Sequence, residues 1–145
     1  MSEPAREVRI ERTYAAPIEA VFDAWTSPEV MRRWLHPGPD WGTPEAEVDL
    51  RVGGRVRVVM RRPDGSQAEA RGEYTLIDRP QRLVMTWVFD DDPANQQVLE
   101  LTFSETSGAT TVRLVNTGIS SDERRDNQEW GWIECLGELE RLLAG

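Results

Sequence analysis

His36 is the only histidine of the chain, so it is the only side chain whose ordinary pKa suits proton transfer near neutral pH. It lies four residues before Asp40 in a proline-rich segment, and a histidine–aspartate pair beside a serine would be the arrangement of a hydrolase. The chain has no Gly-x-Ser-x-Gly motif, and Ser27 and Ser66 stand in cap or turn contexts. We therefore predict no catalytic residue and interpret His36 as a loop histidine that contacts backbone or solvent.

The remaining chemistry-bearing residues exclude several kinds of site. One histidine and one cysteine, Cys135, cannot build a zinc site of the usual His/Cys kind. The run Asp90–Asp92 before Pro93 lacks the spacing of a calcium loop and is typical of a surface turn. All 17 basic residues are arginine, and the absence of lysine excludes Schiff-base chemistry, including that of pyridoxal phosphate. We predict no metal and no cofactor.

The C-terminal segment 120–145 is expected to form a long helix against which the rest of the chain packs. Ser120 or Ser121 can cap it, and its apolar residues recur at spacings of four, three and four: Trp132, Leu136, Leu139 and Leu143. Gly131 interrupts this helix at a cost of about 1 kcal/mol relative to alanine. Two interpretations remain open: Gly131 keeps a space free, or it lets a strand approach closely.

The preceding chain reads as one strand, two helices and six further strands. The expected strand at 6–14 has the charges of a sheet edge, Pro17 and Ser27 begin short helices, and residues 35–44 form a proline-rich loop. Turn residues then separate strands expected at 45–52, 55–62, 67–78, 82–89, 97–105 and 109–117, with Gly53-Gly54 as a two-residue hairpin turn. Because each strand has one apolar side, the sequence predicts an α+β fold in which a curved antiparallel sheet wraps around the C-terminal helix.

Such a sheet leaves room for a cavity lined by aromatic side chains. Six tryptophans are many for this length, and they could form cavity walls or an ordinary core, to which we assign Trp25. The residues expected to line the cavity and bind a ligand are Trp34, His36, Trp41, Val58, Met60, Tyr74, Met85, Trp87, Leu101, Gln128, Gly131 and Trp132.

Composition limits the partners. A chain of 145 residues with 39% hydrophobic and 30% charged residues fits one domain, 1–145, and its net charge of −9 argues against a nucleic-acid partner. No run approaches the roughly 20 apolar residues of a membrane span, so no membrane insertion is expected. The start, MSEPAREVRI, lacks the apolar segment of a secretory signal, and a single cysteine suits a reducing cytoplasm. A homodimer is compatible with the sequence.

Four stretches carry a family resemblance: APIEAVFDAWTSPEVMRRWL, AEVDLRVGGRVRVVMRRPDG, RPQRLVMTW and GWIECLGELERLL. The chain resembles the activator-of-heat-shock-protein-90-ATPase-like (AHSA-type) family of the START-like, or SRPBCC, superfamily. The resemblance implies a helix-grip fold with a cavity between the sheet and the C-terminal helix. The chain departs from many relatives at Leu76, where they carry an acidic residue, and at Trp34-Leu35-His36-Pro37, where they often have two tryptophans and a glycine before the proline.

Three functions follow as hypotheses. The leading one is a binding protein that holds an apolar or aromatic small molecule in the cavity. The second is a cyclase- or lyase-type enzyme that uses His36, Asp40 or Tyr74 as acid or base. The third, less favoured, is a chaperone-associated interaction module; the resemblance covers a single START-like module, so direct stimulation of a chaperone ATPase is not expected.

Overall fold

The computed structural model describes residues 6–145. Residues 1–5 lie outside the described part. They belong to the expected single domain, 1–145, and to the N-terminal segment that was considered as a secretory signal. The elements in chain order are β1 (Val8–Tyr14), α1 (Ile18–Thr26), α2 (Pro28–Trp34), β2 (Gly42–Val48), β3 (Arg55–Arg61), β4 (Gln67–Asp78), β5 (Arg82–Phe89), β6 (Gln97–Thr106), β7 (Ala109–Thr117) and α3 (Asp122–Ala144).

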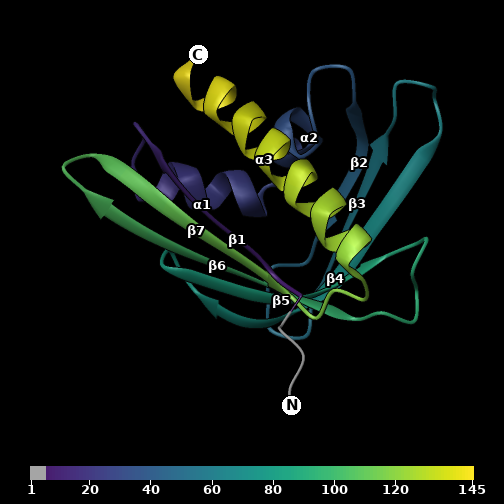
Figure 1. The fold of residues 1–145 in the computed structure, drawn as a ribbon. Helices are drawn as coiled ribbons and strands as arrows, with labels where there is room; N and C mark the ends of the chain where they lie inside the picture. The colour runs from purple at the N-terminus through teal and green to yellow at the C-terminus, as the bar shows by residue number, and fades with distance from the viewer. Residues whose placement is uncertain (1–5) are drawn as a thin grey trace.

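The seven strands form one curved antiparallel sheet in the order β1-β7-β6-β5-β4-β3-β2. β1, the first strand of the chain, lies at one edge, and the other six strands follow as a meander. The sheet curves around α3, which crosses its concave side, while α1 and α2 cover the sheet behind that helix in the view of Figure 1. The predicted helix-grip architecture is confirmed.

α3 begins where the sequence provides a cap. Ser121 is its N-cap, and the hydroxyl of Ser121 accepts a hydrogen bond from the backbone N–H of Arg124 at 3.1 Å. Further along the helix, an apolar stripe lies buried against the sheet: Trp132, Leu136 and Leu139, with Leu143 partly buried. Among the helices of residues 6–145, none is both long enough and apolar enough to cross a lipid bilayer.

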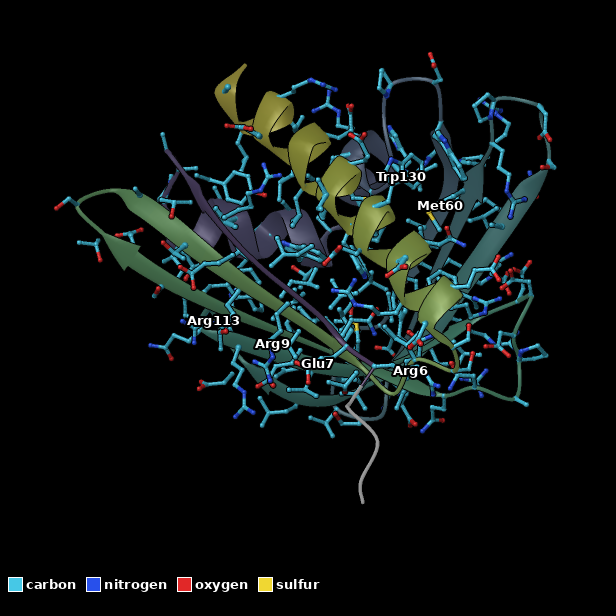
Figure 2. The ribbon with its side chains drawn as sticks, viewed as in Figure 1. Arg6, Glu7, Arg9, Met60, Arg113 and Trp130 are labelled. Atoms are coloured by element: carbon cyan, nitrogen blue, oxygen red, sulfur yellow. The ribbon has the colours of Figure 1, made fainter. Side chains whose placement is uncertain are left out.

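The convex face of the sheet carries charged residues that pair across neighbouring strands. Arg57 on β3 lies within 4 Å of three carboxylates on the neighbouring strands, those of Glu45, Glu47 and Glu69. Arg9 and Arg113 lie at the outer side of β1 and β7 in Figure 2, and Arg113 pairs with Glu11 at 3.1 Å. These arginines belong to a solvated face stabilised by cross-strand pairs.

The predicted two-residue turn at Gly53-Gly54 is wrong. β2 ends at Val48, so residues 49–54 form a longer connection. The backbone N–H of Gly53 donates to the carbonyl of Tyr74, and the N–H of Tyr74 donates to the carbonyl of Gly54. A Cβ on Gly54 would lie 2.0 Å from the carbonyl oxygen of Asp49. The backbone N–H of Gly54 donates to the carbonyl of Arg51 at 2.8 Å and Gly53 has a φ of 86°, so the two glycines do stand in a tight turn, but within this longer connection.

Candidate functional site

An open cavity of about 640 Å³ lies between the N-terminal half of α3 and the concave side of β3, β4 and β5. Figure 2 shows Met60 on the strand side and Trp130 on the helix side of this space. The wall comprises Leu35, Pro37, Trp41, Val58, Met60, Arg62, Ala68, Trp87, Phe89, Asp90, Asp91, Ser121, Glu123, Arg124, Asn127, Gln128, Trp130, Gly131, Trp132 and Cys135.

Strand and helix periodicity place these side chains. Val58, Met60 and Arg62 follow one another at intervals of two on the same side of β3, and Trp87 and Phe89 do so on β5. From α3, residues three and four apart face the cavity, as Asn127, Gly131 and Cys135 do. The wall is therefore built from the concave side of β3, β4 and β5, from α3 and from the loop that carries Trp41.

Gly131 faces open space. Within residues 6–145, a Cβ built on Gly131 would meet no atom within 4 Å apart from its immediate helical surroundings. No strand approaches the helix closely at this point, which removes one of the two interpretations of this glycine. The missing side chain at Gly131 leaves part of the cavity free, at the known cost of glycine in a helix interior.

Aromatic rings line the inner wall and connect it to the core. The ring centroids of Trp87 and Trp132 are 5.9 Å apart with the planes tilted by 40°, and Trp87 and Phe89 meet edge-to-face at 6.2 Å. On its other side Trp132 lies 6.0 Å from Trp25, which is buried in the core. Contacts of this kind hold large aromatic side chains in fixed orientations, so the wall is rigid as well as apolar.

A buried amide network ties α3 to the sheet beside the cavity. Gln128 on α3 donates through Nε2 to Gln97 Oε1 at 2.8 Å and to Asn116 Oδ1 at 2.8 Å. Asn116 Nδ2 donates to Gln97 Oε1 at 3.0 Å and to the carbonyl of Val98 at 3.2 Å. The Nε1–H of Trp132 donates to Asn116 Oδ1 at 3.1 Å. Since Gln97 Nε2 in turn donates to Gln128 and Asn95, the amide groups of Gln97, Asn116 and Gln128 have no N–H left for a ligand.

Charged side chains stand at the rim. Arg124 in α3 pairs with Asp91 at 2.6 Å and with Asp92 at 3.2 Å, which links the helix to the β5–β6 connection. At the β3 side, the guanidinium carbon of Arg62 lies 5.9 Å from the ring centroid of Trp41. The rim is thus polar, whereas the depth of the cavity is lined by aromatic and aliphatic side chains.

The structure brings most of the predicted site residues to the cavity wall: Trp41, Val58, Met60, Trp87, Gln128, Gly131 and Trp132. The others, Trp34, His36, Tyr74, Met85 and Leu101, are buried elsewhere. Trp34 donates its Nε1–H to the carbonyl of Ala24 at 2.8 Å and stacks edge-on against Trp25, so it belongs to the packing of α1 and α2. Met85 and Leu101 lie on the concave face among core residues rather than at the cavity.

Several wall residues were not predicted. Phe89 shares the face of Trp87, and Arg62 shares that of Met60, so strand alternation could have identified both. Cys135 follows Gly131 at a helical spacing of four, whereas Trp130 is adjacent to Gly131 and has no such signal. The acidic rim residues Asp90 and Glu123 carry no sequence signal beyond an ordinary surface turn and a helix start. The thiol of Cys135 is buried, and this burial raises its pKa, so it serves as an apolar wall group.

The three acid–base candidates do not meet. His36 and Tyr74 are buried away from the cavity wall, and Asp40 is exposed. Thr43 Oγ1 donates to the carbonyl of Leu35 at 2.8 Å, so it accepts from His36 Nδ1–H, also at 2.8 Å. This hydrogen bond holds the loop to β2, and burial, which lowers the pKa of His36, favours the neutral imidazole. The hydroxyl of Tyr74 has no hydrogen-bond partner among the described residues, and burial raises its pKa.

A pH dependence follows from His36. Burial lowers the pKa of His36 below its ordinary value of 6.5, against a smaller opposite effect of Glu138. Protonation therefore favours the unfolded chain, and the stability from neutral His36 is lost as the pH falls below about 6.5. His36→Asn keeps an N–H near the position of Nδ1 and cannot titrate. We expect its free energy of unfolding, measured in urea, to fall less than that of the parent between pH 7 and 5. Parallel curves for the two proteins would contradict this assignment.

The chain matches the protein family described as Activator of Hsp90 ATPase homolog 1-like protein over residues 15–144. This match covers both short helices, β2 to β7 and α3. Comparison with proteins of curated function gave no match.

Solved structures similar to the chain include three bacterial proteins. A protein from Chromobacterium violaceum has a TM-score of 0.86 at 25% identity, with 97% of this chain and 98% of that chain covered. The AHSA1 protein from Silicibacter pomeroyi has a TM-score of 0.83 at 26% identity, over 95% and 97% of the two chains. CalU16 from Micromonospora echinospora has a TM-score of 0.74 at 27% identity, over 96% and 76%.

Proposed function

The chain belongs to the family of activator of Hsp90 ATPase homolog 1-like proteins, and within this family we propose that it binds an apolar or aromatic small molecule in the cavity between α3 and the sheet. The observation that carries the proposal is the open space at Gly131, in front of a wall of tryptophan side chains. Gly131 is part of the cavity wall, so a larger side chain at this position would occupy volume that a ligand needs.

The cavity has the size and the walls of a small-molecule site. Its volume of about 640 Å³ lies within the range of roughly 300–1,000 Å³ that such sites occupy. Trp87, Trp132 and Phe89 offer flat, largely apolar surfaces, and the charged groups Arg62, Asp90 and Glu123 stand at the rim. Rigid walls reduce the entropy lost on binding, so a ligand that fits can bind with useful affinity.

The enzyme alternative has less support. A general acid or base must reach the reacting atoms within hydrogen-bond distance or through one water molecule. Neither His36 nor Tyr74 lines the cavity, and both are held in the core. Asp40 is exposed on the loop. The interaction-module alternative would be favoured by a filled interior, whereas the space beside α3 is open.

Fluorescence titration with N-phenyl-1-naphthylamine tests the proposal. This probe is neutral, apolar and aromatic, and it becomes fluorescent on leaving water. We expect saturable binding of one probe per chain, with a dissociation constant on the order of 10 μM, because the probe has about 17 heavy atoms at roughly −0.4 kcal/mol each. Quenching of tryptophan fluorescence should follow the same curve. A fluorescence increase that is linear in probe concentration, or that persists in urea-unfolded protein, would refute a specific cavity site.

A further inference from the structure

Two arginines line the cavity among the residues that the structure describes, and their surroundings differ. The charge of Arg124 is balanced by Asp91 and Asp92. Arg62 has no carboxylate oxygen within 4 Å of its guanidinium in residues 6–145. The nearby Asp64 instead accepts hydrogen bonds from the N–H and the hydroxyl of Ser66, at 2.8 and 2.6 Å. Arg62 also lowers the pKa of Asp64, but less than the hydrogen bonds from Ser66 do.

The guanidinium of Arg62 is held in place by neutral groups. Its Nη1 donates to the hydroxyl of Ser66 at 3.2 Å and to the carbonyl of Gln67 at 3.0 Å, and Trp41 lies against it. These contacts occupy Nη1 alone. Nε and Nη2 have no hydrogen bond among the described residues, and they form the side of the guanidinium that binds a carboxylate with two hydrogen bonds. The side chain is half-buried, so less conformational entropy is lost when it binds a ligand.

The distribution of polarity orients a ligand. The depth of the cavity offers Trp87, Trp132 and an amide network with no N–H to spare, so it suits an apolar group. The rim has Arg62 at the β3 side, and the acidic residues Asp90 and Glu123 at the β5 and α3 side. An anion is repelled by these carboxylates and attracted by Arg62, so it is directed to one place on the rim.

We propose that the ligand is an amphipathic aromatic carboxylate, with its ring system packed against the cavity side of Trp87 and Trp132 and its carboxylate on Arg62. This inference rests on the proposed function and adds the chemical class of the ligand and the residue that selects it. No bond is made or broken, because the site is one of binding alone.

A matched pair of competitors tests the charge preference. 1-Naphthylacetate and 1-naphthylacetamide have nearly the same shape, and only the first carries a negative charge at pH 7. Each is titrated against bound N-phenyl-1-naphthylamine at 150 mM salt, where the repulsion by the net charge of −9 is screened beyond about 8 Å. We expect the carboxylate to bind about tenfold more tightly than the amide, which corresponds to about 1.4 kcal/mol.

Two variants assign the preference to a residue. Arg62→Gln should remove the tenfold difference and change the affinity for the amide by less than about twofold. Arg61→Gln is the control, because Arg61 is the adjacent, exposed arginine outside the cavity wall and its loss changes the net charge equally. Arg62→Lys keeps the charge without the fork and should retain part of the preference. Thermal melting of all three shows whether the fold is intact.

Each outcome decides the question. Loss of the preference in Arg62→Gln alone supports the proposal. Equal binding of the two naphthyl compounds by the parent protein overturns it, as does an equal loss in Arg61→Gln, which would indicate a long-range charge effect. A uniform loss for both compounds in Arg62→Gln would give Arg62 a structural role only. If the neutral probe itself does not bind, the proposed function fails first and this inference fails with it.

Discussion

Gly131→Leu is expected to weaken binding of N-phenyl-1-naphthylamine about a hundredfold, equivalent to about 2.7 kcal/mol, while the Tm stays the same or rises. The added side chain enters space that holds no other atom within 4 Å of its Cβ, so it displaces the ligand rather than the core. Leucine is also a better helix former than glycine by up to about 1 kcal/mol. Probe titration and thermal melting of one variant measure both effects.

Gly137→Leu is the matched control. Gly137 lies in the same helix, its Cβ would also meet no atom within 4 Å, and it is not part of the cavity wall. This variant should gain the same helix propensity and keep the probe affinity of the parent. If Gly131→Leu instead lowers the stability by about 1–3 kcal/mol and retains the probe, the position is one of close packing and the cavity account is wrong.

Asn116→Leu is expected to lower the free energy of unfolding by about 3 kcal/mol. Asn116 is fully buried, and its amide takes part in four hydrogen bonds that join β7 to β6 and α3. Leucine has a similar volume but leaves the Nε1–H of Trp132 and the carbonyl of Val98 without this partner. An unsatisfied buried polar group costs about 1–3 kcal/mol, and the lost bonds add to this. Urea unfolding measures the change.

Thr13→Val provides the comparison for Asn116→Leu. Thr13 and Thr111 share a hydroxyl–hydroxyl hydrogen bond of 2.8 Å on the exposed side of the β1–β7 pair. Because water can replace this bond, its loss should change the free energy of unfolding by less than about 0.5 kcal/mol. A cost below about 1 kcal/mol for Asn116→Leu would show that the buried network contributes little to holding α3 on the sheet.

Local sequence signals predicted the elements well. β4, β5 and β7 have the expected bounds because turn residues such as Pro63-Asp64-Gly65 and Ser107-Gly108 mark where each strand must end. Gly53-Gly54 marks a turn correctly, but the length of the connection was wrong, because β2 already ends at Val48. A glycine pair therefore locates a turn in the sequence without giving the length of the connection around it.

The cavity could be predicted only in part. Alternation told which face of a strand points inward, and Met60 and Trp87 do line the cavity. It could not tell how far along the strand the cavity extends: Met85 shares the face of Trp87, yet it lies two residues away, about 7 Å, in filled core. Arg62 was missed because a charged residue does not fit an apolar list, although its spacing from Met60 places it on the same wall.

The most direct test of the cavity account uses the six indole N–H signals in a ¹H–¹⁵N NMR spectrum, assigned with single Trp→Phe variants. Four tryptophans line the cavity: Trp41, Trp87, Trp130 and Trp132. Trp34 and Trp25 do not line the cavity. The ring of Trp25 lies 6.0 Å from that of the wall residue Trp132. During titration with 1-naphthylacetamide the four wall signals should shift and saturate together, while that of Trp34 stays in place. Shifts that spare Trp87 and Trp132, or that never saturate, would contradict binding in this cavity.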